Sequence, residues 1–323
     1  MRPSTFLRPR AWLLGSAAAL TVLSAFTGYK VHAVARELVD PPFYRVPSLD
    51  RVAATYQELA QGGAGDPGGV WERLEANGVQ LWTLKRRQRS PGTVLLLHGF
   101  GDDRWGTSPA LRWFPGLDAA IFTYRRRDDA LRSGGPVPPV TFGARESDEV
   151  VQAVHALEAQ GLPRKRLVLM GRSLGASVGI LALIKLEREK RGPLGGIVWE
   201  GAPASSRDFG ERLVRGSRDR FWHPLLAPLI GDLGSRWAAH SAGYDREETD
   251  LQKQLDGLML ETPSLCFLAT QDRLAPQDSQ RHVASHFTSV QRIDVPTWHL
   301  HCSEHLGPKY AEAILGATRR WLP

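Results

Sequence analysis

The strongest constraint on the fold is a series of short segments that are apolar at nearly every position. Residues Val94 to Leu97 and Leu167 to Met170 contain no polar side chain at all. A strand with one face in water alternates apolar and polar residues, whereas a strand covered on both faces is apolar throughout. These segments therefore predict strands of a buried, mostly parallel sheet.

Six short strand-like segments, several of them apolar at nearly every position, follow one another along the chain at residues 93–97, 119–124, 166–170, 196–199, 264–269 and 290–295. Helical stretches separate them, and residues 144–160 place apolar side chains at helical spacing. Strands that alternate with helices are joined by right-handed crossovers, which place helices on both faces of the sheet. We therefore predict an α/β fold.

The rest of the chain is assigned around this sheet. Residues 202–260 contain no strand-like segment, and we expect them to form a helical cap over the carboxyl ends of the strands; helices on the flank of the sheet are the alternative. Residues 33–69 are expected to be a linker, with a helix at 49–61 and a glycine-rich end at 62–69. The main domain then covers 70–323 and begins with a hairpin at Asn77-Gly78.

The amino terminus carries an uncharged segment, residues 11–29, preceded by three arginines. As a helix it would be about 28 Å long, close to the hydrocarbon thickness of a bilayer. We therefore predict that residues 1–32 form a cytoplasmic tail and a signal-anchor. This would make a single-pass membrane protein whose main domain is extracytoplasmic. A cleaved signal peptide is the alternative.

Charge and cysteine content exclude several classes of protein. The net charge is +7, but the 41 Lys and Arg are spread along the chain among 34 acidic residues. No motif that reads nucleic acid accompanies them, so we expect no nucleic-acid partner. Two cysteines, Cys266 and Cys302, are too few for a disulfide framework or a four-thiolate metal site. They are expected to pack as buried thiols, with a single bridge as the alternative.

The segment Gly171-Arg172-Ser173-Leu174-Gly175 stands between a buried strand and a helical stretch. A serine on a sharp strand-to-helix turn needs small neighbours, because the backbone brings the residues two before and two after it close together. We therefore predict that Ser173 is a nucleophile and that Gly171 and Gly175 permit the turn.

The segment His98-Gly99-Phe100-Gly101 ends an earlier buried strand. Glycines there let the backbone turn so that N–H groups point into a site, and acyl transfer needs two such donors for the developing oxyanion. We expect the amides of Phe100 and Leu174 to be these donors, since Leu174 opens a helix whose N-terminus favours negative charge. His98 and Gly99 would support the turn.

A serine hydroxyl needs a base to take its proton and an acid to hold that base. Asp272 follows the apolar segment at 264–269 and is the predicted acid, with Asp278 as its rival. Three histidines compete for the base: His299, His301 and His305. We favour His305, because it stands just ahead of the final helical stretch. The histidine spacing also resembles a metal-binding motif, but its acidic residue and last histidine fall one place late, so no metal is predicted.

These segments together resemble the α/β-hydrolase superfamily, and within it the membrane-anchored single-domain hydrolases of bacteria and eukaryotes. The resemblance covers roughly residues 70–323 and predicts a mostly parallel sheet of about eight strands. It implies that Ser173 attacks a substrate carbonyl, that His305 acts as base and then acid, and that Asp272 orients His305. One departure is Tyr124-Arg125-Arg126-Arg127-Asp128, where many relatives carry Asp-x-Arg-Gly-x-Gly.

The function that this resemblance implies is hydrolysis of carboxylic esters through an acyl-enzyme, without a metal or nucleotide cofactor. Peptidases, thioesterases and lipases use the same catalytic groups, so these activities remain open. A membrane-anchored binding module is the alternative from a different class. The expected partners are a small-molecule or lipid-like ester substrate and the membrane, through residues 11–29. The sequence makes no prediction about oligomeric state.

Overall fold

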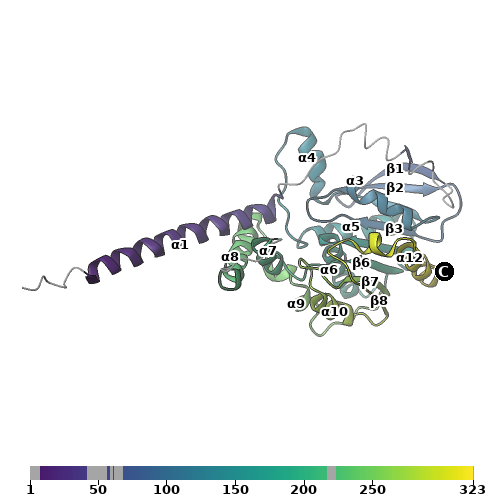
Figure 1. Ribbon diagram of the computed structural model, residues 1–323. Coiled ribbons are helices and arrows are strands. Elements are labelled where there is room, and N and C mark those ends of the chain that lie inside the picture. The colour runs from purple at the N-terminus through teal and green to yellow at the C-terminus, as the bar shows by residue number, and fades with distance from the viewer. Residues whose placement is uncertain (1–7, 42–56, 59–60, 62–67, 217–222, 323) are drawn as a thin grey trace, which may run out of the picture.

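The computed structural model describes residues 8–41, 57–58, 61, 68–216 and 223–322 (Figure 1). The helix expected at 49–61 and the glycine-rich segment at 62–69 lie largely outside these described residues.

One sheet forms the centre of the molecule, with strand order β1-β2-β4-β3-β5-β6-β7-β8. Its first three strands in that order pair antiparallel, and every pair from β4–β3 onward is parallel. The predicted α/β fold with a mostly parallel sheet of about eight strands is thus confirmed. The strands are β1 (Gly69–Ala76), β2 (Val79–Arg86), β3 (Thr93–Leu97), β4 (Asp118–Ile121), β5 (Leu167–Arg172), β6 (Gly196–Glu200), β7 (Ser264–Ala269) and β8 (Val290–Val295).

Helices cover both faces of the sheet, as Figure 1 shows. Side chains of β3 alternate between two apolar clusters, Leu95 and Leu97 in one and Val94 and Leu96 in the other, so the strand is buried on both sides. The first face carries α5 (Glu146–Ala159), α6 (Leu174–Arg188), α9 (Leu251–Leu255) and α10 (Gln277–Ser285). The second carries η2 (Ser108–Trp113) and α12 (Pro308–Trp321). Shorter elements are α3 (Arg104–Thr107), η3 (Tyr124–Arg126), α4 (Arg127–Ser133), η4 (Arg164–Arg166) and α11 (Cys302–Leu306).

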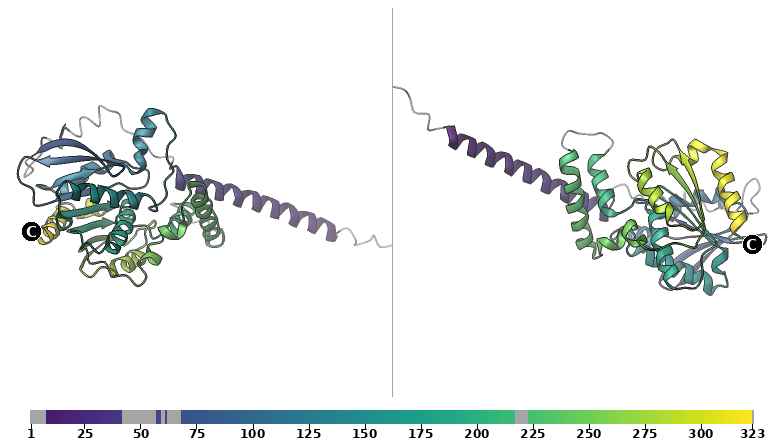
Figure 2. Two further views of the ribbon diagram at one scale, coloured as in Figure 1. Left: turned by 180° about the vertical axis from the view of Figure 1, so that it is seen from behind. Right: turned by 90° about the horizontal axis from the view of Figure 1, so that it is seen from below.

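Between β6 and β7 the chain forms a helical insertion. It contains α7 (Ser206–Arg215), α8 (His223–Ala242), η5 (Arg246–Thr249) and α9. The helices α7 and α8 lie side by side at one end of the molecule, next to the amino-terminal helix (Figure 2). The insertion therefore follows the carboxyl end of β6, the place where the sequence predicted a cap.

The amino-terminal helix α1 (Arg8–Val39) corrects the predicted membrane anchor. Its later turns pack against α7 and α8 and bury Val31, Val34, Ala35 and Leu38. The uncharged segment 11–29 is therefore part of a longer helix that continues through charged residues into this packing. Among the helices within the described residues, none has both the length and the apolar character needed to cross a bilayer. The predicted single-pass span, with its membrane localisation, is contradicted by this finding.

The carboxyl group of Glu149 on α5 makes stability depend on pH. Its Oε2 accepts a hydrogen bond from the amide of Arg125 at 2.7 Å, and burial raises the pKa of the carboxyl to about 7. A carboxyl whose folded-state pKa is raised stabilises the fold when protonated, and this contribution is lost as pH rises toward and through 7.

We therefore expect Glu149→Gln, which keeps an oxygen acceptor without the charge, to raise the free energy of unfolding at pH 8 by at least about 1 kcal/mol. At pH 4.5 the two proteins should differ little. Urea denaturation at both pH values measures this, with the exposed Glu312→Gln on α12 as control. Equal effects of Glu149→Gln at the two pH values would contradict the expectation.

Candidate active site

Ser173 occupies a sharp turn between β5 and α6. Its backbone angles, φ 52° and ψ −127°, lie in a region that non-glycine residues rarely adopt. The backbone crowds on itself there: a Cβ on Gly171 would lie 2.4 Å from the carbonyl oxygen of Gly175, and one on Gly175 would lie 2.2 Å from that of Leu97. This crowding is the physical reason for glycine at both positions. The amide of Ser173 donates to the carbonyl of Glu200 at 2.9 Å, which ties the turn to β6.

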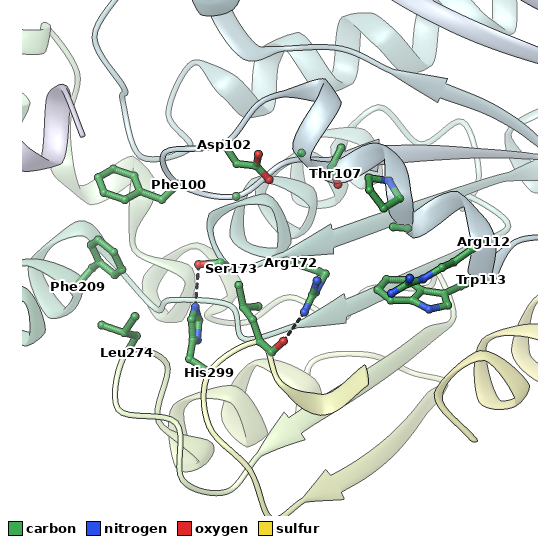
Figure 3. A pocket seen from close by; sticks show the side chains of 15 residues that line it. Phe100, Asp102, Thr107, Arg112, Trp113, Arg172, Ser173, Phe209, Leu274 and His299 are labelled. Atoms are coloured by element: carbon green, nitrogen blue, oxygen red, sulfur yellow. Dashed lines mark hydrogen bonds between the residues drawn. The ribbon is translucent and has the colours of Figure 1, made fainter. Parts of the chain in front are cut away.

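A histidine and a carboxylate complete a chain of hydrogen bonds from Ser173, and Figure 3 shows its first link, from Ser173 to His299. The Nε2 atom of His299 lies 3.0 Å from Ser173 Oγ, and its Nδ1 atom lies 2.7 Å from Asp272 Oδ2. With Nδ1 protonated, the imidazole donates to Asp272 and Nε2 is left to accept the serine proton. The structure thus brings Ser173 and Asp272 together as the sequence predicted, but through His299.

The predicted base, His305, is not the histidine that contacts Ser173. Residues 302–306 form the short helix α11, which buries Cys302 and leaves the side chain of His305 exposed. His301 is also exposed, and its Nδ1 lies 2.6 Å from Glu304 Oε2. The correction has a simple cause: His299 comes four residues after the end of β8, whereas the later histidines are carried away by α11. Proximity to the strand end was the sequence feature that could have selected His299.

Asp272 is held in place as a hydrogen-bond acceptor by the loop after β7. Its side chain is completely buried, and its Oδ1 accepts the amides of Leu274 and Ala275, each at 2.8 Å. The second oxygen remains for His299, so the ring has one fixed orientation.

His98 supports the turn after β3. Its Nδ1 lies 3.0 Å from the carbonyl of Gly99, and its Nε2 accepts the amide of Tyr124 at 3.1 Å. Burial lowers the pKa of His98 to about 3, so the ring stays neutral and can accept at Nε2 while donating at Nδ1. The ring therefore joins the turn after β3 to the end of β4.

The two predicted oxyanion donors, Phe100 and Leu174, both lie near Ser173. Leu174 is the first residue of α6, and its amide is one of the four at a helix N-terminus that lack a partner within the helix. Phe100 lies in the turn after β3 and lines the same pocket as Ser173. Their role as donors remains a prediction.

Ser173 and His299 open into a pocket of about 290 Å³ (Figure 3). On one side of Ser173 lie Phe100, Phe209 and Leu274; the rings of Phe100 and Phe209 meet edge to face at 5.1 Å. The other side is polar, with Asp102, Thr107, Arg112 and Arg172 around Trp113. Phe209 comes from α7, so the helical insertion contributes directly to the wall of this pocket.

Asp102 places a weakly acidic group in the polar side of the pocket. Burial raises the pKa of its carboxyl to about 6, although the positive charge of Arg172 acts in the opposite direction. The carboxyl is therefore partly protonated in mildly acidic solution and ionised above neutrality.

Within the described ranges, no three His, Cys, Asp or Glu side chains are placed to hold a metal ion. Cys266 and Cys302 are both free and buried, and burial raises the pKa of the Cys266 thiol to about 12. The alternative of a single disulfide is therefore not what the structure contains.

The chain resembles known proteins in its three-dimensional structure but not in its sequence. Neither a protein-family model nor a curated protein sequence matches the chain. Solved structures do match: the esterase Pf2001 of Pyrococcus furiosus is 15% identical, with a TM-score of 0.57, over 79% of this chain and 94% of that one. A crystal structure of EstE5 soaked with p-nitrophenyl butyrate is 15% identical, with a TM-score of 0.54, over 91% and 96%.

A third match, esterase E25, is 15% identical, with a TM-score of 0.55, over 85% of this chain and 82% of that one. The chain has an α/β-hydrolase fold. In α/β-hydrolases the serine follows a strand-to-helix turn and precedes the acid and the histidine in the chain. The hydrogen-bonded residues Ser173, Asp272 and His299 stand in that order.

Proposed function

We propose that this protein is a serine hydrolase that cleaves carboxylic esters through an acyl-enzyme intermediate. One observation carries the proposal: Ser173 Oγ, the His299 ring and Asp272 form a continuous hydrogen-bonded chain at the base of a pocket. The α/β-hydrolase fold and its esterase neighbours support it.

In the acylation step, His299 Nε2 takes the proton from Ser173 Oγ as that oxygen attacks the ester carbonyl. The Asp272 carboxylate stabilises the imidazolium that forms. The imidazolium then gives its proton to the departing alcohol oxygen, and the serine ester remains. A water molecule, deprotonated by the same Nε2, attacks this ester. The imidazolium then returns that proton to Ser173 Oγ as the bond from Oγ to the acyl carbon breaks and the acid is released.

The negative oxygen of each tetrahedral intermediate would be held by the amides of Phe100 and Leu174. One belongs to the turn that His98 supports and the other to the N-terminus of α6, whose dipole favours negative charge. Both donors belong to the backbone and need little reorganisation when the charge develops.

The helical insertion would act as a cap, because Phe209 of α7 forms part of the pocket wall. The pocket of about 290 Å³ is at the small end of the range for ligand sites, about 300–1,000 Å³. We expect kcat/KM for p-nitrophenyl butyrate to exceed that for p-nitrophenyl palmitate by at least about tenfold, or about 1.4 kcal/mol. Steady-state kinetics below the micellar concentration of each ester measures this, and a preference for palmitate would contradict it.

Labelling with a fluorophosphonate tests the proposed function. The wild-type protein should become labelled at Ser173, as located by peptide mass spectrometry, and should hydrolyse p-nitrophenyl butyrate. Ser173→Ala should lose both properties while keeping its melting temperature. A folded wild-type protein that neither reacts nor hydrolyses short esters or thioesters would refute the proposal and favour a binding module.

A further inference from the structure

An ion pair with a buried carboxylate lies directly beside the proposed active site. Arg172, at the end of β5, precedes Ser173, and Glu200 ends the neighbouring strand β6. The two residues are paired in the register of the sheet, and Arg172 Nε donates to Glu200 Oε2 at 3.1 Å. The Glu200 side chain is completely buried. A carboxylate in that position is costly unless several donors compensate for the water it has lost.

The donors that compensate Glu200 come from the segment after β8. Its Oε1 accepts the amide of Cys302 at 3.0 Å, and its Oε2 also accepts the hydroxyl of Tyr310 at 3.0 Å. Tyr310 is itself fixed by stacking on Phe267, with ring centroids 4.1 Å apart. Glu200 therefore holds the loop that carries His299 from its carboxyl-terminal side.

Arg172 holds the same loop one residue after His299. Its terminal Nη2 donates to the carbonyl of Leu300, as the second dashed line in Figure 3 shows. Leu300 has φ 62°, a left-handed conformation that is uncommon for a residue with a side chain. The guanidinium also lies over the Trp113 ring, 5.6 Å from its centroid, which limits its movement.

From these contacts we infer that Arg172 and Glu200 are positioning residues: together they fix the 299–302 loop so that His299 Nε2 stays within hydrogen-bonding distance of Ser173 Oγ. The inference rests on the proposed function, since it gives His299 the role of base. Arg172 can link the two catalytic groups because its backbone is joined directly to Ser173, while its guanidinium donates a hydrogen bond to the loop that carries His299. A shift of this loop would change the distance between serine and histidine directly.

Two other roles make different predictions. If Arg172 binds substrate, its loss weakens binding and leaves the chemical step unchanged. If the pair only stabilises the fold, its loss lowers the melting temperature without a specific effect on reactivity. A positioning role lowers the rate at which Ser173 reacts, and a displacement of about 1 Å costs about a hundredfold in rate.

Arg172→Lys is the most informative variant. Lysine keeps a positive charge beside Glu200, but its single ammonium lacks the rigid fork that contacts Glu200 and the Leu300 carbonyl together. The double variant Arg172→Met/Glu200→Gln removes both charges, so no unpaired charge is left buried. The matched control is Arg164→Lys, because Arg164 precedes the other end of β5 and is held, more deeply buried than Arg172, in an ion pair with Glu158.

Two measurements decide the inference. The first is inactivation by a fluorophosphonate, resolved into its limiting rate and its half-saturating concentration. The second is hydrogen exchange of peptides that cover residues 297–306. We expect Arg172→Lys and the double variant to react about 10- to 100-fold more slowly at saturation, with the half-saturating concentration within about threefold. Exchange in 297–306 should accelerate in both variants, while Arg164→Lys should change neither quantity.

The inference is overturned if Arg172→Lys retains the wild-type limiting rate and exchange, or if only its half-saturating concentration rises. It is also overturned if Arg164→Lys produces the same loss, because the effect would then belong to the fold as a whole. A wild-type protein that does not react at all would be a different result: it would refute the proposed function, and the assigned role of the loop with it.

Discussion

Replacing His299 by alanine is expected to lower kcat for ester hydrolysis by about 10⁴-fold or more, whereas His305→Ala should leave it within about threefold. The reason is that His299 is the imidazole bonded to both Ser173 and Asp272, while His305 is exposed on α11. Without that base, the serine hydroxyl must lose its proton to water. Hydrolysis of p-nitrophenyl butyrate by the purified variants measures the difference.

Two controls make this comparison strict. The melting temperature of His299→Ala should stay close to that of the wild type, since Asp272 keeps the amides of Leu274 and Ala275 as donors. Added imidazole should restore part of the activity, because it can occupy the space that the ring has left. The assignment fails if His305→Ala is the variant that loses activity while His299→Ala retains it.

The sequence did not identify which of the three histidines contacts Ser173. The order of serine, acid and histidine came from the resemblance to α/β-hydrolases, and it selected Asp272, whose Oδ2 lies 2.7 Å from His299 Nδ1 in the structure. The path of the loop after β8 depends instead on contacts with residues more than a hundred positions away, namely Arg172 and Glu200. No local pattern in residues 296–306 encodes those contacts.

The central strands of the sheet were predictable because a strand that is buried on both faces is apolar at nearly every position. The predicted segments at 93–97 and 264–269 coincide with β3 and β7, which are buried throughout. The segment at 290–295 coincides with β8, an edge strand in which only Val295 is buried. The segment expected at 119–124 ends early, since β4 stops at Ile121 and Arg125 and Arg126 adopt left-handed backbone angles. The apolar residues continue beyond the end of this strand because Phe122 and Tyr124, in the turn that follows it, are also buried.

The amino-terminal helix illustrates the opposite case. Its uncharged segment was long enough to suggest a membrane span, but within the described residues no helix is apolar enough over such a length to cross a bilayer. In the fold, Val31, Val34 and Leu38 of α1 pack against α7 and α8, which lie some 200 residues later in the chain. The partner of an apolar helical face is a tertiary property, and composition alone could not identify it.

Gly201 provides the second large effect, because its backbone lies directly against the His299 ring. It follows Glu200 at the end of β6 and has φ +66°. A Cβ at this position would lie 2.9 Å from His299 Cε1 and 3.1 Å from its Nδ1. The ring is already fixed by Ser173 and Asp272, so it can make room only by giving up one of those hydrogen bonds.

We therefore expect Gly201→Ala to lower kcat by about a hundredfold, together with a loss of stability of about 1 kcal/mol from the strained backbone. Gly192→Ala is the matched control: Gly192 also has a positive φ, +86°, but a Cβ there meets no atom within 4 Å. Both variants should lose similar stability in urea denaturation, and only Gly201→Ala should lose activity and reactivity toward a fluorophosphonate. If Gly201→Ala keeps its activity, the added methyl group is accommodated without moving the His299 ring, and the expectation is wrong. If both variants lose activity equally, the loss comes from the strained backbone and not from the contact with the ring.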